Sequence, residues 1–533
     1  MNFTIKTIGC KVNTYESSKI RDELCKLGFN YIDVEEKDKY SELDFYIVNT
    51  CSVTKIADKK SRQMLHLAKK YNPNVKVIAI GCMVDSLSVR ADDDIVGAKH
   101  REPTDVGKDI IRPRTGELRE PHRTGELREP HRTGELREPH LDGVDYLISN
   151  KDKDKLKDIL LSLTNTVGAK HREPTDVGKD IIRPRAGELR EPHRTGELRE
   201  PHRTGELREP HRTGELCEPN HNRIRANIKI QDGCNQYCTY CIIPFLRGNI
   251  ISRDNDDIIS EIKEKVKNGV KEIVLTGIHL SSFGLDRVNK TYESEGAIDI
   301  ARKELLTIMS QIAEIDGVER IRLGSLEPRI IDENFLKTLL GLNVAHIVSD
   351  DGVGKKHCEP ASVEASELAK KFCANFCLSL QSGCDKTLKR MNRHYTTADY
   401  ENACNLIRKH MPYATITTDV IVGFPGETEE DFAASLDFVK RMKFYNPNIF
   451  PYSRRQGTKA DKMPDQLTNE EKHSRSVLMI AECEKISKEI EEEYFTKYSD
   501  RASDVLVEES YEENGKKYGI GYTKEYIKRV IAI

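Results

Sequence analysis

Strand-like and helix-like segments alternate along two long stretches of the chain. Within residues 3–82, the strand-like segments "FTIKTI", "DFYIVNT" and "VKVIAIG" are separated by helical segments. Within residues 226–453, helices separate the strand-like segments "ANIKIQ", "KEIVLTGI", "RIRLGSL", "NFCLSLQ", "ITTDVIVGF" and "PNIFPYS". This alternation predicts an α/β fold with parallel sheets covered by helices. A chain of 533 residues is long enough for two or three such domains.

Three cysteines follow strands of the first stretch. Cys10 comes after "FTIKTI", Cys51 after "DFYIVNT" and Cys82 after "VKVIAIG". The carboxyl ends of parallel strands share one edge of a sheet, where such folds bind ligands. We therefore expect the three thiols to form a site at this edge, although three small core residues would give the same pattern.

A second group of cysteines lies in the segment "DGCNQYCTYCIIPFLRG" at 232–248, where Cys234, Cys238 and Cys241 have the spacing C-x3-C-x2-C. Three thiolates can bind three irons of a 4Fe–4S cluster and leave the fourth iron open to another ligand. A structural zinc ion usually takes a fourth protein ligand, and the nearest histidine is His221, 13 residues before Cys234. A redox pair of Cys238 and Cys241 is a further alternative.

Composition sets limits on the setting. The net charge of −3 gives no overall signal for nucleic acid, so any RNA contact must come from local patches. No apolar run approaches 18 residues, and the N-terminus lacks the features of a signal peptide. We expect a cytoplasmic protein without membrane contact, whose fourteen cysteines serve packing, catalysis or metal binding rather than disulfides.

Internal repeats interrupt the chain. The segment "VGAKHREPTDVGKDIIRPR" occurs at 96–114 and 167–185, and each copy runs into tandem copies of "RTGELREPH". These repeats carry little apolar surface and a regularly spaced proline, so we expect low-complexity insertions at 96–140 and 167–220. A regular solenoid or a partner-binding array is the alternative. The segment near 342–368 is also expected to be an insertion.

The cysteine loop after "NIKIQ", including Tyr240 before its last cysteine, resembles the signature of radical S-adenosylmethionine (SAM) enzymes. With a second cysteine triad upstream, the whole chain apart from its repeats resembles the methylthiotransferases. Further segments that are similar to this family are "LSLQSG" at 378–383, "VGFPGET" at 422–428 and "FPYSRRQGT" at 450–458. One departure is Cys377, where the family usually has histidine. A rival cluster of Cys373, Cys377 and Cys384 is less favoured, because their placement along a strand suits core packing.

The resemblance implies a three-part fold. An N-terminal parallel-sheet domain of flavodoxin-like type is expected at 1–166 and a partial (β/α)6 radical SAM barrel at 221–467, with its active site at the carboxyl ends of the strands. A connecting helix is expected at 468–498. A short TRAM-like β-barrel that binds RNA is expected at 499–533, where tyrosines could stack on splayed bases.

The resemblance also implies the chemistry. Two 4Fe–4S clusters and SAM are expected, with Cys234, Cys238 and Cys241 on the cluster that cleaves SAM. Cys10, Cys51 and Cys82 are expected to hold an auxiliary cluster that carries the transferred sulfur. The expected partners are the anticodon stem-loop of tRNA and an electron donor such as flavodoxin or ferredoxin, and the protein is expected to be a monomer. No catalytic residue is assigned. Candidates for contact with SAM or substrate are Gly277, Ser325, Glu327, Gln381, Arg247 and Arg253.

Two segments indicate the branch of the family. "GCKVNTYES" at 9–17 and "LTGIHLSSFG" at 275–284 resemble the branch that methylthiolates carbon 2 of N6-threonylcarbamoyladenosine at position 37 of tRNA. The alternatives are the same chemistry on isopentenyladenosine of tRNA or on a ribosomal protein. A non-enzymatic alternative is an interaction scaffold, built from the repeats on a decaying enzyme.

Overall fold

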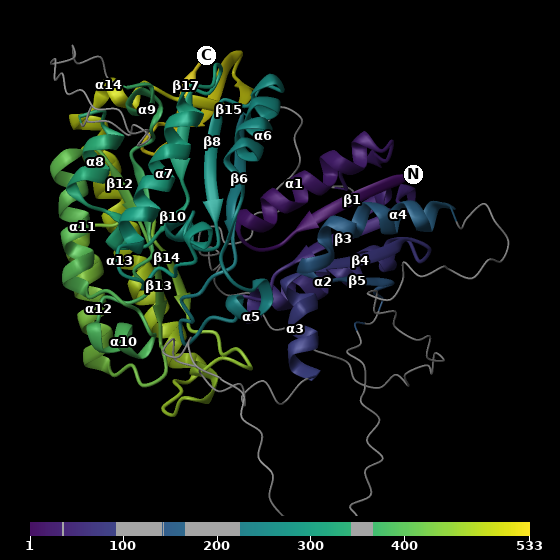
Figure 1. The fold of residues 1–533 in the computed structure, drawn as a ribbon, viewed down its shortest axis with the longest axis horizontal. Helices are drawn as coiled ribbons and strands as arrows, with labels where there is room; N and C mark the ends of the chain where they lie inside the picture. The colour runs from purple at the N-terminus through teal and green to yellow at the C-terminus, as the bar shows by residue number, and fades with distance from the viewer. Residues whose placement is uncertain (35–36, 92–140, 142, 166–223, 343–365) are drawn as a thin grey trace, which may run out of the picture.

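The computed structural model describes residues 1–34, 37–91, 141, 143–165, 224–342 and 366–533. Both repeat insertions, and nearly all of the insertion expected near 342–368, lie outside the described residues. Two α/β units stand side by side, and a small antiparallel sheet lies at one end of the larger unit (Figure 1).

The N-terminal unit is built on one parallel sheet with the strand order β2-β1-β3-β4-β5. This is the flavodoxin-like order expected from the sequence. The strands are β1 (Asn2–Thr7), β2 (Asn30–Tyr31), β3 (Phe45–Thr50), β4 (Lys76–Gly81) and β5 (Tyr146–Ile148). The helices are α1 (Lys11–Lys26), α2 (Lys55–Tyr71), α3 (Cys82–Ala91) and α4 (Leu156–Asn165).

Side-chain alternation along the strands builds a core on each face of this sheet. In β3, Tyr46 and Val48 belong to one buried cluster, whereas Phe45 and Ile47 belong to another. Such strands are buried on both faces, which explains their nearly continuous apolar sequence. The strand β5 comes from the segment between the two repeat insertions and pairs with β4, so that segment belongs to this sheet.

The larger unit is a partial barrel, and each of the six expected strand segments forms a strand in it. The strands are β6 (Arg225–Asp232), β8 (Glu272–Gly277), β9 (Arg320–Leu323), β10 (Ser325–Leu326), β11 (Asn375–Leu378), β12 (Thr415–Thr417), β13 (Asp419–Val422) and β14 (Asn448–Pro451). They pair in parallel as three short sheets. Isolated bridges from Ile321 to Phe372 and from Gln381 to Val420 connect these sheets. The short strand β7 (Ile251–Ser252) pairs antiparallel with β6.

Helices cover the outside of the barrel (Figure 1). They are α6 (Asn255–Lys267), α7 (Ala297–Ala313), α8 (Glu333–Leu339), α9 (Glu367–Lys371), α10 (Asp385–Arg390), α11 (Thr397–His410) and α12 (Glu429–Met442), whereas α5 (Ile243–Arg247) lies between the two units beside α3. The starts of α11 and α12 are fixed by capping boxes at Thr396 and Thr428. Buried residues of the strands and of these helices form one large core.

A long helix leads from the barrel to the C-terminal sheet. The helix α13 (Asn469–Lys497) begins at a capping box on Thr468, and the short helix α14 (Ser499–Ala502) follows it. The last strands, β15 (Leu506–Glu513), β16 (Lys516–Tyr522) and β17 (Lys528–Ala532), form a three-stranded antiparallel sheet. The expected closure of these strands into a TRAM-like barrel is not confirmed.

Buried charged and aromatic residues join the C-terminal segment to the amino ends of the barrel strands, and we call these contacts the seal. Glu272, the first residue of β8, accepts hydrogen bonds from Arg225 (2.7 Å) and Arg322 (3.0 Å). The guanidinium of Arg322 lies 4.3 Å from the ring centre of Tyr526 in the C-terminal segment. Arg320 of β9 donates a 2.7 Å hydrogen bond to the carboxylate of Asp504.

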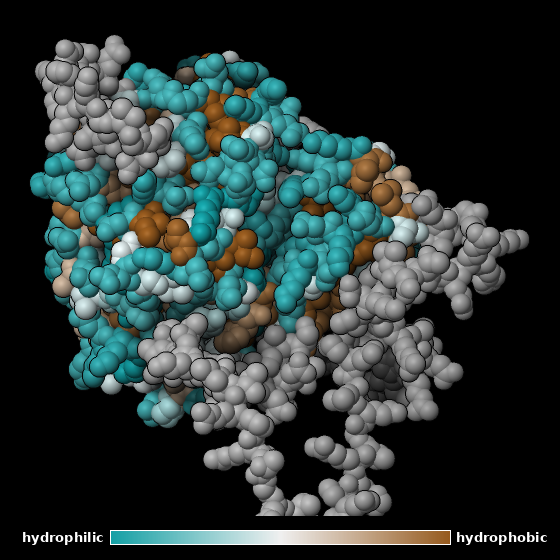
Figure 2. Space-filling model, in the orientation of Figure 1, coloured by the Kyte–Doolittle hydropathy of each residue, from teal (hydrophilic) through white to brown (hydrophobic). Residues whose placement is uncertain are grey.

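Hydrophilic residues predominate on the face of the molecule shown in Figure 2, and hydrophobic residues appear there as separate patches. Among the described residues, no helix is both long enough and apolar enough to cross a membrane.

Candidate functional site

The first cysteine triad lies at one edge of the N-terminal sheet. Cys10 is the N-cap of α1 after β1, Cys51 directly follows β3, and Cys82 is the first residue of α3 after β4. Because β1, β3 and β4 are neighbours in the sheet, residues up to 72 positions apart in sequence meet at the same edge. The structure thus brings these three cysteines together as the strand pattern predicted.

Glycines make room for this convergence. Gly9 has φ +120°, and a side-chain carbon there would lie 2.9 Å from Cβ of Cys51. Gly81 has φ +100°, and the same atom there would lie 2.7 Å from the carbonyl oxygen of Thr50. A residue with a side chain at either position would push the strand ends apart, so both glycines are required by the close approach of the strands.

The thiols of the first triad are close enough to influence one another's ionisation. Burial, together with the nearby thiols of Cys82 and Cys10, raises the pKa of Cys51 to about 12. A cluster of thiols that resists ionisation needs a positive charge to become a set of thiolates, and a bound metal centre supplies that charge. The side-chain amide of Asn150 donates to the sulfur of Cys82 at 3.6 Å. The donor set therefore fits an iron–sulfur cluster.

The second triad is held in one loop between β6 and α5. The backbone N–H of Cys234 donates to the carbonyl of Gly248 (3.0 Å), and that of Cys241 donates to the carbonyl of Cys238 (2.9 Å). Gly233 has φ +67°, and a side-chain carbon there would lie 1.8 Å from the carbonyl oxygen of Asn249. The loop is thus closed on itself by its own backbone.

Distant residues of the barrel support the same loop. Thr239 bonds through its backbone N–H to the carbonyl of Met391 (3.1 Å). Arg393 donates from its guanidinium to the sulfur of Cys238 at 3.2 Å. The ring of Tyr240 stands edge-on to the ring of Phe424, 6.4 Å between centres, so the segment "VGFPGET" packs against the loop. Burial, with the neighbouring thiol of Cys238, raises the pKa of Cys234 to about 11.

The two triads adjoin across the interface between the units. Cys82 packs with Ile242 and Leu246, which directly follow the loop of the second triad. Within the described residues, no three His, Cys, Asp or Glu side chains are grouped as ligands of a single metal ion. A 4Fe–4S cubane instead binds each thiolate at a different corner, which suits triads whose sulfurs stand further apart.

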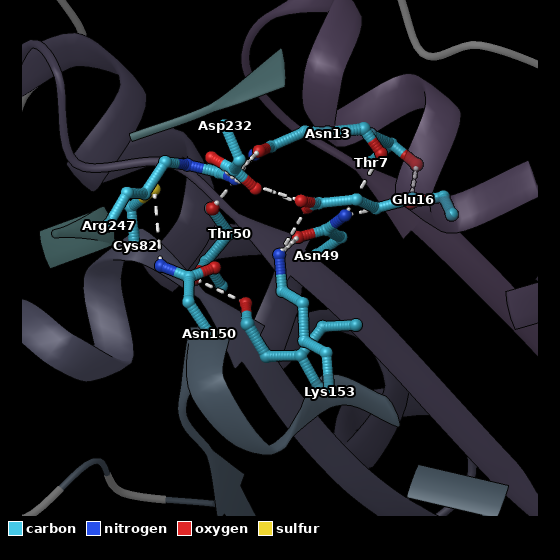
Figure 3. A network of polar contacts seen from close by, with 12 residues as sticks. Thr7, Asn13, Glu16, Asn49, Thr50, Cys82, Asn150, Lys153, Asp232 and Arg247 are labelled. Atoms are coloured by element: carbon cyan, nitrogen blue, oxygen red, sulfur yellow. Dashed lines mark hydrogen bonds and ion pairs between the residues drawn. The ribbon is translucent and has the colours of Figure 1, made fainter. Parts of the chain in front are cut away.

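A buried network of charges joins the two units beside the triads (Figure 3). Glu16 of α1 accepts a hydrogen bond of 2.8 Å from Arg247 and one of 3.1 Å from Lys229. Its other carboxylate oxygen accepts from Lys153 of the N-terminal unit. Arg247 also bonds to Asn13 (2.9 Å) and to Asp232 (3.0 Å), and its side chain is only 2% exposed. Burial tends to raise the pKa of Glu16, but the charges of Lys153, Arg247 and Lys229 hold it well below its usual value.

The candidate contacts for SAM or substrate fall into two groups. Arg247 is committed to the network above, and Arg253 donates to the hydroxyl of Tyr15 (3.0 Å) and pairs with Glu261 (2.8 Å). Both arginines therefore have protein partners at the interface between the units, and contact of either with SAM or phosphate stays a prediction.

The other four candidates lie on the barrel. Gly277 ends β8, where a side-chain carbon would lie 2.8 Å from Oε1 of Gln231. Ser325 begins β10 and is exposed, whereas Glu327, just after this strand, is buried and accepts a 2.8 Å hydrogen bond from Arg329. Gln381 has φ +67° and bonds through its backbone to the neighbouring strand β13. Their contacts with SAM or substrate also stay predictions.

The rival cysteine set is not gathered as a triad. Cys373 is fully buried in the core, whereas Cys377 is half-buried and its sulfur lies 3.1 Å from Oγ of Ser325. Cys384 is the N-cap of α10 and donates to Asp431 at 3.6 Å. Core packing therefore describes Cys373, and the other two have separate polar partners.

The tyrosines of the C-terminal sheet have two different settings. Tyr522 and Tyr526 stack on each other (4.5 Å between ring centres), and the guanidinium of Arg225 lies against both rings. Tyr511 and Tyr518 stack at 5.4 Å, and Tyr511 is 39% exposed. The first pair belongs to the seal under the barrel, whereas the second pair includes the exposed Tyr511.

Sequence reasoning missed Glu16, Lys153 and Lys229 as a network, and it missed Arg393 as a partner of Cys238. The quoted segment "GCKVNTYES" contains Glu16, but a lone acidic residue on a helix gives no sign of its partners. Arg393 lies 155 residues after Cys238, so no local pattern connects the two.

Two family models match the chain. The model of the radical SAM superfamily matches residues 228–439, and the model described as uncharacterized protein family UPF0004 matches residues 2–96. The chain therefore carries a radical SAM domain preceded by a UPF0004 domain, and it is an enzyme. The expected resemblance to the methylthiotransferases is confirmed.

Curated relatives cover nearly the whole chain. A threonylcarbamoyladenosine tRNA methylthiotransferase of Bacillus subtilis is 28% identical over 98% of this chain and 89% of its own length. The corresponding protein of Aquifex aeolicus is 28% identical over 89% of this chain and 86% of its own length. A tRNA-2-methylthio-N(6)-dimethylallyladenosine synthase of Clostridium tetani is 29% identical over 97% of this chain and 88% of its own length. The radical SAM domain implies one 4Fe–4S cluster and SAM.

Proposed function

We propose that the chain is a tRNA methylthiotransferase that modifies carbon 2 of N6-threonylcarbamoyladenosine at position 37. The observation that carries the proposal is the junction of the two triads, where Cys82 packs against residues that directly follow Cys241. Transfer of sulfur to a carbon activated by radical chemistry requires a sulfur carrier close to the site of SAM cleavage. A radical SAM loop beside a second set of three thiols meets that requirement.

In this proposal, Cys234, Cys238 and Cys241 hold the cluster that binds SAM, and Cys10, Cys51 and Cys82 hold an auxiliary cluster. When bound, these groups supply one-electron cleavage of SAM and a transferable sulfur. The chain supplies position: its loop, its glycines and its interface network set where each thiol stands. Arg393 adds a positive charge and a hydrogen bond beside the sulfur of Cys238, where it would also stand beside the bound cluster.

The substrate is proposed from the relatives and from the local sequence. The first two relatives described above are named for threonylcarbamoyladenosine, and the segments at 9–17 and 275–284 resemble that branch. The anticodon loop of tRNA is single-stranded, so one base can be splayed into the mouth of the barrel at a cost of a few kcal/mol. The exposed Tyr511, stacked on Tyr518, is a stacking surface for a neighbouring base.

The test is mass spectrometry of nucleosides from the tRNA of a host that lacks its own enzyme, with and without this chain. Appearance of the methylthiolated threonylcarbamoyl nucleoside supports the proposal. A host that also makes N6-dimethylallyladenosine provides the competing substrate in the same cells. If only that nucleoside gains the methylthio group, the substrate is wrong although the chemistry holds. If only a ribosomal protein gains the corresponding mass, the RNA substrate is wrong.

A further inference from the structure

A row of polar residues crosses the inner face of the barrel, with a step of two residues between Thr417 and Asp419 on the same segment. Strand pairing sets Ser325 of β10 opposite Cys377 of β11, and Cys377 opposite Thr417 of β12. Asp419, which begins β13, lies opposite Asn448 of β14. The row is thus a continuous feature of adjacent strands.

Burial shows which face carries the row. Each of its members is partly or fully exposed, whereas their neighbours on the same strands, such as Phe376, Ile416 and Ile449, are buried in the core beneath the outer helices. Successive side chains of a strand point to opposite faces, so the exposed members point into the lumen of the barrel.

Hydrogen bonds within the row leave some of its polar groups open. The sulfur of Cys377 and Oγ of Ser325 are 3.1 Å apart, and the amide of Asn448 donates to Oδ1 of Asp419 at 2.9 Å. Among the described residues, the second carboxylate oxygen of Asp419 and the side-chain carbonyl of Asn448 have no hydrogen-bond donor. The row therefore offers acceptors to a molecule in the lumen.

The side chain of Lys11 carries a positive charge at the end of the helix that packs against the barrel. Lys11 is the first residue of α1 and directly follows Cys10. The helix α1 packs on β6 and β8 and meets the lumen side of β6, because Glu16 bonds to Lys229, which alternates with the buried Ile228 and Ile230. Lys11 is exposed, and among the described residues none forms a hydrogen bond or ion pair with its side-chain ammonium.

The charge of Lys11 acts on the row, in agreement with the packing of α1 on the lumen side of the barrel. Burial raises the pKa of Asp419, and the positive charge of Lys11 opposes that rise. Burial and the carboxyl of Asp419 raise the pKa of Cys377 to about 11, and Lys11 again acts in the opposite direction. The cation of Lys11 is therefore within reach of the strands that carry the row.

We propose that Lys11 binds the carboxylate of the threonyl group on the substrate base, and that Asp419 and Asn448 accept hydrogen bonds from its urea N–H groups or hydroxyl. This inference rests on the proposed function and gives a physical reason why the enzyme would select threonylcarbamoyladenosine. The threonylcarbamoyl group presents one anion and several N–H and O–H donors. An open lysine above carboxylate and amide acceptors complements each of them. A dimethylallyl group would leave all of these groups without partners, which costs binding energy.

The experiment uses the full chain with both clusters reconstituted and three versions of one anticodon stem-loop RNA. The first carries threonylcarbamoyladenosine, the second carries its methyl ester, which removes only the negative charge, and the third carries dimethylallyladenosine. The variants are Lys11→Met, Lys11→Arg and, as a matched control on the exposed side of the same helix, Lys19→Met. RNA affinity is measured by fluorescence anisotropy, and kcat/KM is measured by mass spectrometry of the product.

Lys11→Met should weaken binding of the acid RNA by about tenfold, the lower end for loss of a hydrogen bond to a charged group, and should leave the ester RNA within about twofold. Lys11→Arg should retain most of the preference for the acid, and Lys19→Met should change neither RNA. Equal losses on acid and ester, or no loss on either, would overturn the role of Lys11. If the unaltered chain instead prefers the dimethylallyl RNA, the proposed function fails, and this inference fails with it.

Discussion

Cys234, Cys238 and Cys241 occupy one loop whose ends are tied by its own backbone, whereas Cys10, Cys51 and Cys82 come from the ends of three strands. The first arrangement is fixed by a few neighbouring residues. The second exists only when the N-terminal sheet is complete. A local site thus depends on the chemistry of its own loop, and an assembled site depends on the stability of a whole domain and of its contact with the barrel.

The strongest test of this comparison replaces each triad separately. The triple variant Cys234→Ala, Cys238→Ala, Cys241→Ala should lose reductive cleavage of SAM and retain about four irons, the content of one 4Fe–4S cluster. The triple variant Cys10→Ala, Cys51→Ala, Cys82→Ala should also retain about four irons but should still cleave SAM. Iron and sulfide analysis and the yield of 5′-deoxyadenosine measure both outcomes. Cleavage of SAM by the first variant would contradict the assignment of its loop.

Removing Arg247 tests how far the assembled site depends on the interface. Arg247→Ala removes one of the three cations around the buried Glu16 and a main partner of the half-buried Asp232, which should cost about 3 kcal/mol of unfolding free energy, the lower end for a broken buried ion pair. The midpoint of urea unfolding of the metal-free protein measures the loss. The matched control is Lys26→Ala, which removes an exposed ion pair with Glu264 between the same two units and should cost about 0.5 kcal/mol or less. Equal losses in both variants would show that the buried network has no special part in docking.

A single substitution at Gly9 tests the triad of Cys10, Cys51 and Cys82 alone. Gly9→Ala places a carbon 2.9 Å from Cβ of Cys51 at a positive φ, so it should lower the iron content by up to one cluster and spare cleavage of SAM. Gly28→Ala is the control, because Gly28 also has a positive φ but has no atom within 4 Å of the added carbon. Each substitution should cost about 1–2 kcal/mol through its backbone conformation. Iron loss in the Gly28 variant as well would show that backbone strain, rather than crowding of Cys51, is the cause.

The smallest effect is expected from the repeat insertions. A variant lacking 96–140 and 167–220 keeps β5 and α4, which lie between the two insertions and complete the sheet. Because long surface insertions add little loop-closure cost, its melting temperature should stay within a few degrees of that of the full chain. Differential scanning fluorimetry and iron analysis provide the measurement. Selective loss of the auxiliary iron would show that the insertions help to build the assembled site.

The sequence allowed both triads to be located, for different reasons. The loop of Cys234 is a local pattern, and the convergence of Cys10, Cys51 and Cys82 follows from the order of strands in a parallel sheet. The partners of Glu16 could not be predicted, because they come from segments whose contact depends on how the two units dock. Strand propensity near the C-terminus predicted strands, which the structure confirms, whereas closure into a barrel was expected from the resemblance and is not confirmed, because closure depends on pairing between the first and last strands.

The seal beneath the barrel has a consequence for synthesis on the ribosome. Arg320 is made 184 residues before Asp504, its partner. At about 5–20 residues per second, the nascent barrel carries this arginine without its partner for roughly 10–40 seconds. The delay is longer for Arg225 and Arg322, because both contact the ring of Tyr526, which is made after Asp504. The emerging chain therefore presents an open, positively charged barrel end throughout elongation, and only the last strands to be translated convert it into a closed enzyme.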